Sequence, residues 1–99
     1  NSTNFFIIRS GEVWTSTGEY CLKGITRSTV ISICKQNQIP ILEKNFSIDD
    51  VYTANEAFVT GTFAGITPAV EIDGRKINNS LRGELTKALQ NYYKDQVNS

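Results

Sequence analysis

The sequence has no histidine and only two cysteines among its 99 residues. The absence of histidine excludes a Ser-His-Asp triad and a histidine-ligated metal site within this chain. Two isolated cysteines make a poor zinc site, so we expect no bound metal. Cys21 and Cys34 could form at most one disulfide, and Cys34 falls in an apolar helical pattern that is typical of a buried free thiol. Free thiols favour a reducing compartment, so we expect a cytoplasmic protein.

An excess of charge of one sign is also lacking. Ten Lys and Arg residues cancel ten Asp and Glu residues, and the formal net charge is zero. The chain therefore lacks the basic surplus that binds nucleic acid or anionic membranes, and we expect neither partner. No apolar run approaches the length of a membrane span. One alternative is a secreted glycoprotein modified at Asn1, Asn45 or Asn78, which predicts a Cys21–Cys34 disulfide.

A hydrophobic content of 39% suffices for one modest core, so residues 1–99 are expected to form a single domain or a fragment of one. Two β-rich runs on either side of Ser10-Gly11 predict a hairpin at the start. A helix is predicted from Thr26 to about Gln38, before Pro40. One face of this helix is mostly apolar, with Val30, Ile33, Cys34 and Asn37 at the spacing i, i+3, i+4, i+7.

The second half of the chain adds further elements of both kinds. Residues 39–46 predict a strand, and Ser47 with Asp50 marks the start of a short helix. Residues 56–62 predict a strand that runs into a loop, and Asp73-Gly74 predicts a second hairpin. The last helix is predicted from the apolar positions Leu81, Leu85, Ala88, Leu89 and Tyr92. The fold class that follows is α/β or α+β, a mixed sheet with flanking helices.

The stretch CLKGITR, residues 21–27, is the first candidate binding loop. Gly24 allows the backbone to come close to a ligand, and the amides of Ile25 and Thr26 fall at a helix start. Amides there lack partners and the helix dipole is positive, which suits a phosphate group. In the alternative interpretation, Thr26 is only a cap, Gly24 only a turn and Arg27 a solvated side chain.

The stretch VTGTFAGITP, residues 59–68, is the second candidate. It gathers Thr60, Gly61, Thr62 and Gly65 at a strand end, where exposed amides and hydroxyls could hold an anion. Its alternative is a bulge or turn that needs glycine to bend. The two loops are more informative together than apart, but their composition names no ligand.

Three stretches of the sequence resemble the class IV aminotransferases. They are YCLKGITRSTV, IDDVYTANEAFVTGTFAGITPAVEIDGRKI and LTKALQNYY. These fold-type IV pyridoxal-phosphate enzymes include branched-chain aminotransferase, D-amino acid aminotransferase and aminodeoxychorismate lyase. The resemblance extends over nearly the whole chain. It implies the carboxy-terminal part of the enzyme's large domain, and the loops would then bind pyridoxal 5'-phosphate and substrate.

The resemblance also implies a role for each loop. The amides at the helix start hold the cofactor phosphate, the preceding leucine packs on the pyridine ring, and the Thr-Gly-Thr loop completes the phosphate site and receives the substrate carboxylate. The implied cofactor-binding residues are Leu22, Gly24, Ile25, Thr26, Gly61 and Thr62. The implied substrate-binding residues are Thr62 and Phe63.

Two catalytic groups of the family have no counterpart in this segment. The family's Schiff-base lysine lies upstream, and its ring-nitrogen glutamate lies just before the position that matches Asn1. Lys23 is not expected to replace the lysine, and Glu19 and Glu71 are expected to be solvated. We therefore expect no catalytic residue here and no activity from this segment alone. A second departure, NNSLRGEL in place of the family's glycine-rich run, leaves the start of the last helix open.

The family's partners and substrates are expected to follow. They are the rest of the enzyme chain, a second copy in a homodimer, and an amino acid with a 2-oxo acid. Branched-chain amino acids are the first expectation, followed by D-amino acids and by a lyase reaction on aminodeoxychorismate. A stand-alone module that binds phosphorylated ligands without catalysis is the alternative from another functional class.

Overall fold

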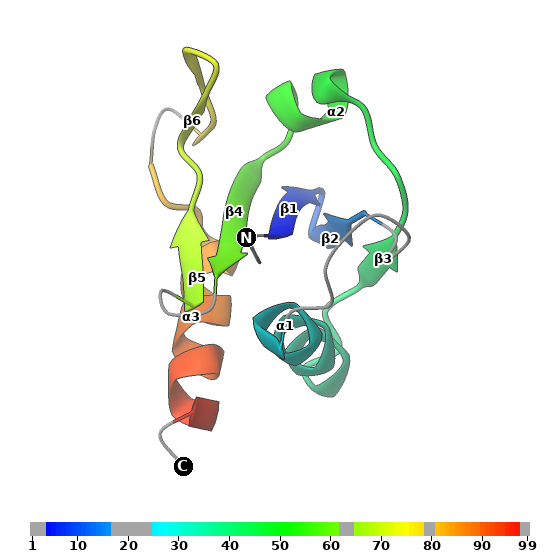
Figure 1. The fold of residues 1–99 in the computed structure, drawn as a ribbon, viewed down its shortest axis with the longest axis vertical. Coiled ribbons are helices and arrows are strands. Elements are labelled where there is room, and N and C mark those ends of the chain that lie inside the picture. The colour runs from blue at the N-terminus through cyan, green and yellow to red at the C-terminus, as the bar shows by residue number, and fades with distance from the viewer. Residues whose placement is uncertain (1–3, 17–24, 62–64, 79–80, 98–99) are drawn as a thin grey trace.

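Five strands form the central sheet of the computed structural model, which describes residues 4–16, 25–61, 65–78 and 81–97 (Figure 1). The strands are β1 (Asn4–Arg9), β2 (Glu12–Thr15), β3 (Ile41–Glu43), β4 (Glu56–Gly61) and β5 (Gly65–Pro68). Their order across the sheet is β3-β2-β1-β4-β5. The β2–β3 pair is parallel and the other pairs are antiparallel. The predicted mixed sheet is thus confirmed.

Helices and a small hairpin cover the two faces of this sheet. The helices are α1 (Ile25–Gln36), α2 (Ile48–Tyr52) and α3 (Glu84–Val97), and the hairpin pairs β6 (Glu71–Ile72) with β7 (Arg75–Lys76). Figure 1 shows α1 and α3 together at the bottom of the view and α2 at the top. Two apolar clusters therefore lie on opposite faces of the sheet.

The larger cluster lies between the sheet and the pair α1 and α3, and contains Phe6, Ile8, Val13, Val30, Ile33, Cys34, Phe58, Ile66 and Leu89. The smaller cluster lies on the opposite face, toward α2 and the β6–β7 hairpin, and contains Ile7, Val51, Ala54, Ala57 and Ile77. Alternation along β1 explains the division, because Phe6 and Ile8 point to one face and Ile7 to the other.

Both predicted hairpins are present. Ser10 and Gly11 have φ values of 50° and 80°, and Asp73 and Gly74 have φ values of 50° and 78°. Two successive residues with positive φ form the turn that matches the twist of a two-residue hairpin. Glycine is favoured at the second position of each because it adopts this conformation without strain.

The first helix lies close to its predicted bounds. It ends at Gln36, two residues before the expected end, and Gln38 adopts a φ of 54°. The side chains of Val30, Ile33 and Cys34 are buried as predicted. Asn37, the polar position of that face, is partly buried. Its side-chain nitrogen Nδ2 donates to the Ile33 carbonyl at 2.9 Å.

Three expectations about the other elements were wrong in part. The strand expected over 39–46 is limited to β3, whose pattern is half-buried and then exposed. Residues 65–68, interpreted as loop, form β5 and pair with β4. Leu81 precedes α3 and is 65% exposed, and Tyr92 is 41% exposed. The buried side chains of α3 are Thr86 and Leu89, with Leu85 and Tyr93 packed beside the larger cluster.

The start of α3 is set by a carboxylate from β4. Glu56 accepts hydrogen bonds from the backbone amides of Leu85 and Thr86, at 3.2 and 2.8 Å, and from the Thr86 hydroxyl at 2.7 Å. A side chain at Gly83 would overlap the Glu56 carboxyl group. This resolves the helix start that the sequence left open.

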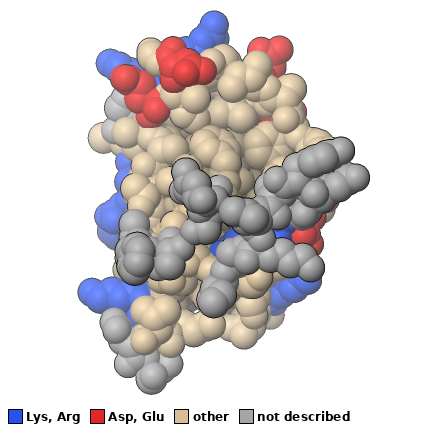
Figure 2. Space-filling view, in the orientation of Figure 1, with Lys and Arg blue, Asp and Glu red and all other residues tan. Residues whose placement is uncertain are grey.

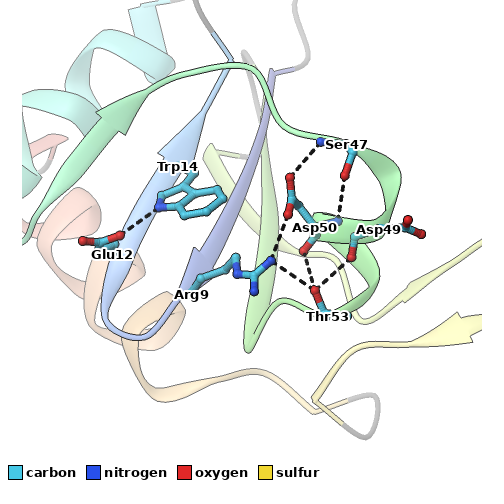
Figure 3. Close-up of polar contacts among 7 residues, drawn as sticks. All are labelled: Arg9, Glu12, Trp14, Ser47, Asp49, Asp50 and Thr53. Atoms are coloured by element: carbon cyan, nitrogen blue, oxygen red, sulfur yellow. Dashed lines mark hydrogen bonds and ion pairs between the residues drawn. The ribbon is translucent and has the colours of Figure 1, made fainter.

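A capping box and an ion pair hold α2 against the sheet. Ser47 accepts from the Asp50 amide, and the Asp50 carboxylate accepts from the Ser47 amide, as the sequence predicted. Figure 3 shows Arg9 reaching from β1 to this helix, where its Nη1 donates to Asp50 Oδ1 at 3.0 Å and to Thr53 Oγ1 at 3.1 Å. Trp14 lies beside Arg9, and its indole N–H donates to Glu12.

Candidate functional site

The amino-terminal turn of α1 differs from those of the other two helices. Its first turn contains no acidic residue, and Ile25 and Thr26 are the expected donors there. By contrast, α2 is capped by Ser47 with Asp50 in a capping box, and α3 receives the carboxylate of Glu56. Since the first amides of a helix have no partner within the helix, the turn of α1 can offer donors to an anion.

A hydrogen bond joins this turn to the end of β4. The Thr26 hydroxyl donates to the carbonyl oxygen of Gly61 at 3.2 Å, across 35 positions of sequence. Thr26 is 8% exposed, and Thr60, which precedes Gly61 in β4, is 1% exposed. The described parts of the two candidate loops are therefore in direct contact, which sequence spacing alone could not establish.

The end of β4 is fixed by its pairing with β5. Gly61 lies opposite Gly65, which has a φ of +67°. A Cβ atom at Gly65 would lie 2.8 Å from the Tyr93 ring of α3. Glycine is thus required at Gly65 both for its backbone conformation and for space.

Three of the predicted site residues belong to the described part of the chain. Ile25 and Thr26 begin α1 and Gly61 ends β4, so the structure brings the two loops together at these positions. The remaining predicted residues, Leu22, Gly24, Thr62 and Phe63, lie outside the described residues. The same holds for Cys21, Lys23 and Glu19.

Arg27 is buried at the same turn, and the interpretation of it as a solvated side chain was wrong. It is 7% exposed, and its Nη2 donates to the Ser16 carbonyl at 2.9 Å and to Glu43 Oε1 at 3.0 Å. Ser16 follows β2 directly and Glu43 ends β3. A signal was available, because Arg27, Val30 and Cys34 follow the spacing of one buried helical face.

The guanidinium of Arg27 is not fully satisfied. Its Nε atom is buried and has no hydrogen-bond partner among the described residues. Glu43, its ionic partner, keeps 48% of its side chain exposed. A buried cation at the amino-terminal turn of a helix also faces the positive end of the dipole, so this placement calls for an explanation.

Other clusters of polar side chains have structural explanations. Arg9 and Lys44 lie over the Trp14 ring, at 5.4 and 4.2 Å from its centroid, and Arg9 also joins the sheet to α2 through Asp50. Glu71 is exposed, as expected. Figure 2 shows Lys and Arg scattered around one face, with Asp and Glu gathered mainly at the end where Figure 1 places α2 and β6.

The described residues contain no group of three potential metal ligands and no helix long and apolar enough to cross a membrane. Cys34 is a buried free thiol, so it does not form the disulfide that the glycoprotein alternative predicts. Desolvation by burial raises the pKa of this thiol from 9.0 to about 11. It is therefore protonated near neutral pH and is not suited to nucleophilic chemistry.

The donor set at α1 fits a phosphate group better than a metal or a cationic ligand. Backbone amides at Ile25 and Thr26, a small-residue strand end at Gly61 and a buried arginine next in sequence all favour negative charge. The Thr26 hydroxyl already donates its proton to Gly61, so the amides are the donors available at this turn.

Comparison with known proteins gives matches to aminotransferases. Residues 1–72 match the family described as amino-transferase class IV. A branched-chain-amino-acid aminotransferase of Pseudomonas aeruginosa is 45% identical over 94 residues, covering 95% of this chain and 31% of that protein. A D-alanine aminotransferase of Listeria innocua is 36% identical over 98 residues, covering 98% of this chain and 34% of that protein.

A solved structure agrees with the fold. The crystal structure of an aminotransferase from Brucella abortus bound to the co-factor PLP superposes with a TM-score of 0.91 and 30% identity. The match covers 99% of this chain and 34% of that one. The chain thus spans about a third of the length of the relatives that it matches.

Proposed function

Because this chain belongs to the amino-transferase class IV family, we propose that it supplies the cofactor-phosphate and substrate-carboxylate loops of a pyridoxal-phosphate-dependent aminotransferase. The observation that carries the proposal is the Thr26–Gly61 hydrogen bond, which joins the turn of α1 to the end of β4. Two anionic groups, a phosphate and a carboxylate, need donors from neighbouring loops if they belong to one bound complex.

Each loop has a defined part in the proposed site. The amides of Ile25 and Thr26 hold the phosphate at the start of α1, and Gly24 permits the close approach of the backbone. Leu22 packs on the pyridine ring. Gly61 and Thr62 complete the phosphate site, and the amides of Thr62 and Phe63 orient the substrate carboxylate. When bound, the cofactor withdraws electrons from the substrate's Cα.

The chain's own residues bind and orient in this proposal, and they do not exchange the proton at Cα. The catalytic lysine and the ring-nitrogen partner come from another part of the polypeptide, so residues 1–99 form the carboxy-terminal part of the large domain and are inactive alone. The full-length enzyme moves an amino group from an amino acid to a 2-oxo acid. A homodimer in the cytoplasm is its proposed form.

Branched-chain amino acids are the proposed substrates. Support comes from the 45% identity to the Pseudomonas aeruginosa branched-chain enzyme, against 36% for the Listeria innocua D-alanine enzyme. The second relative makes transfer from D-amino acids the alternative. Aminodeoxychorismate lyase activity or phospholigand binding without catalysis would be the outcome if neither class of amino acid reacts.

The test uses the full-length polypeptide that carries these residues. Purified protein is titrated with pyridoxal 5'-phosphate while the near-UV and visible absorption is followed, and amino transfer to a 2-oxo acid is assayed with L-leucine and D-alanine. Saturable binding with transfer from L-leucine supports the proposal. Binding without any transfer favours the non-catalytic module, and an absence of binding overturns the assignment of both loops.

The segment itself supplies a second arm of this test. Residues 1–99 are assayed alone and together with the upstream part of the enzyme as a separate polypeptide. We expect transfer only when both parts are present. Transfer by residues 1–99 alone that is abolished by Lys23→Ala would overturn the proposal that the catalytic lysine lies elsewhere.

A further inference from the structure

The side chain of Arg27 spans three elements at the candidate phosphate site. It starts from the first turn of α1, and its Nη2 donates both to the carbonyl of Ser16, just after β2, and to Glu43 Oε1 at the end of β3. Both distances are short, at 2.9 and 3.0 Å. This one nitrogen therefore ties the turn that carries the proposed phosphate amides to the edge of the sheet.

The position is costly for an arginine, which indicates a constraint other than packing. Arg27 is 7% exposed, and its buried Nε lacks a partner among the described residues. A buried donor without a partner destabilises the folded state, because it loses its hydrogen bond to water and gains none in the protein. A positive charge in the first turn of a helix also opposes the dipole. An apolar side chain would avoid both costs but would leave the turn unattached to Ser16 and Glu43.

The ion pair with Glu43 contributes little free energy of its own. The Glu43 side chain is 48% exposed, and solvent-exposed partners weaken an ion pair. The planar guanidinium instead supplies a fixed direction, which a lysine ammonium would not. The geometry of the contact is therefore more informative than its charge.

We propose that Arg27 is a positioning residue, which fixes the first turn of α1 so that its amides converge on the cofactor phosphate. This rests on the proposed function of that turn. Arg27 acts through the backbone of Thr26 and does not need to touch the cofactor. Loss of the contact lets the turn shift relative to Gly61, so binding of the phosphate weakens while binding of the pyridine ring does not.

The test compares ligands with and without the phosphate, in the full-length polypeptide. Pyridoxamine 5'-phosphate and phosphate-free pyridoxamine are the probes, because neither needs a covalent bond to the protein to bind. Their dissociation constants are measured by calorimetry for the unmodified protein and for Arg27→Met and Arg27→Lys. Arg82→Met is the matched control, since Arg82 is exposed and donates to Gln90 of α3.

We expect Arg27→Met to weaken pyridoxamine 5'-phosphate by about tenfold, the equivalent of one lost hydrogen bond. Phosphate-free pyridoxamine should change less than about twofold, because its binding does not use the turn. Arg27→Lys should restore part of the affinity, since it keeps the charge but not the planar fork. Arg82→Met should leave both constants unchanged.

Each other result decides against the inference. An unchanged constant in Arg27→Met, or equal weakening of both probes, indicates a purely structural role. Full affinity in Arg27→Lys indicates that charge alone matters. If Arg27→Met does not fold, Arg27→Lys decides by the same comparison of probes. Failure of the unmodified protein to bind either probe would contradict the proposed function itself, which distinguishes the two failures.

Discussion

Glu56 caps α3, and it can do so only because Gly83 leaves space for its carboxylate. Its carboxylate accepts three hydrogen bonds from Leu85 and Thr86 and occupies the space next to Gly83. A carboxylate at a helix amino terminus satisfies free amides and complements the dipole. Since the acceptor comes from β4, the cap also attaches α3 to the sheet.

Gly83→Ala is predicted to destabilise the folded protein by about 1–3 kcal/mol, because the new methyl group displaces the Glu56 carboxylate. Glu56→Ala is predicted to cost about 1–2 kcal/mol through loss of the cap. Urea unfolding of both variants and of the double variant gives the free energies of unfolding. The double variant should lose less than the sum, since the methyl group has nothing left to displace.

Additive losses of unfolding free energy in the double variant would contradict the contact between Gly83 and Glu56. Gly74→Ala supplies a comparison, because Gly74 has no neighbouring atom to meet a methyl group. Because Gly74 has a φ of 78°, the alanine variant should lower the free energy of unfolding by about 1 kcal/mol. Gly83 is not among the glycines with positive φ, so the two variants lose stability for different reasons. The Gly74 variant should therefore add to Glu56→Ala, whereas the Gly83 variant should not.

Cys34 is predicted to react slowly while the protein is folded. Burial raises its pKa from 9.0 to about 11, so the thiolate fraction at a given pH below 9 falls about a hundredfold. Labelling with iodoacetamide at pH 8, followed by mass spectrometry of the peptide that contains Cys34, measures the rate. Unfolding in urea should restore ordinary reactivity. Equal rates in the folded and unfolded states would contradict the burial.

Residue-level prediction from the sequence succeeded where local pattern decides and was wrong where a partner distant in sequence decides. Cys34 was expected to be buried because its neighbours on the helix are apolar. Arg27 was a solvated side chain in the alternative interpretation of its loop, and arginine is mostly exposed in proteins. Its partners, Ser16 and Glu43, are 11 and 16 positions away. Nothing in the local sequence places them beside it.

At the scale of elements, α2 depends on an ionised aspartate. The backbone amide of Ser47 is the main cause that lowers the pKa of Asp50 below its ordinary value of 3.8, and its hydroxyl and Arg9 contribute further. A lowered pKa in the folded state means that the stabilisation is present at neutral pH and is lost as pH falls through the folded-state value.

Protection of α2 is therefore predicted to decline below about pH 4, before global unfolding. Hydrogen exchange of the Val51 and Tyr52 amides between pH 7 and pH 3, corrected for the intrinsic exchange rate, measures the effect. Asp50→Asn should remove the pH dependence, because its side chain does not titrate. Ser47→Ala should lower the protection at every pH, by about 1 kcal/mol. A pH-independent profile in the unmodified protein would contradict this account.

The contact between α1 and β4 supports another prediction at this scale. Thr26→Val keeps the shape of the side chain but removes the hydroxyl that donates to Gly61. It should destabilise the protein by about 0.5–1.5 kcal/mol, because the carbonyl of the partly buried Gly61 loses this donor. Thr26→Ser keeps the hydroxyl and should lose less. Urea unfolding compares the two, and equal losses would mean that the hydrogen bond contributes nothing measurable.

Elements with a clear period or turn signal were predicted well, and one element was missed. The capping box, both hairpins and the helix face of α1 follow local rules. The strand β5 was missed because Gly65 and Pro68 are depleted in strands. It forms because β4 offers an adjacent edge and Ile66 reaches the larger cluster. Because β5 is an edge strand, the missing backbone N–H of Pro68 is also tolerated.

At the scale of the whole molecule, the sheet carries apolar side chains on both faces. The larger cluster is covered by α1 and α3, and the smaller by α2 and residues near the second hairpin. The composition predicted one modest core, and the pattern of β1 divides it into two. The meeting of the two site loops is a property of this scale, since strand order decides that α1 begins beside the end of β4.

The pairing of β1 with β4 joins the two halves of the sequence, and a stacked aromatic pair lies at its centre. Phe6 and Phe58 are partners in register, with ring centroids 4.7 Å apart and planes inclined by 9°. Both side chains are fully buried. Because the pair links distant segments and contacts α1 and α3 through one cluster, its loss should weaken the sheet as a unit.

Phe58→Ala is therefore predicted to destabilise the fold by about 3–5 kcal/mol, the usual cost of removing a buried aromatic side chain. Tyr92→Ala is the control, since Tyr92 is 41% exposed and should cost less than about 1 kcal/mol. Hydrogen exchange of the full-length polypeptide should show protection falling together in β1, β4 and α1 of the Phe58 variant. A loss confined to β4 would mean that the larger cluster is not one cooperative unit. A common loss would mean that the site at α1 and β4 depends on the same packing as the sheet itself.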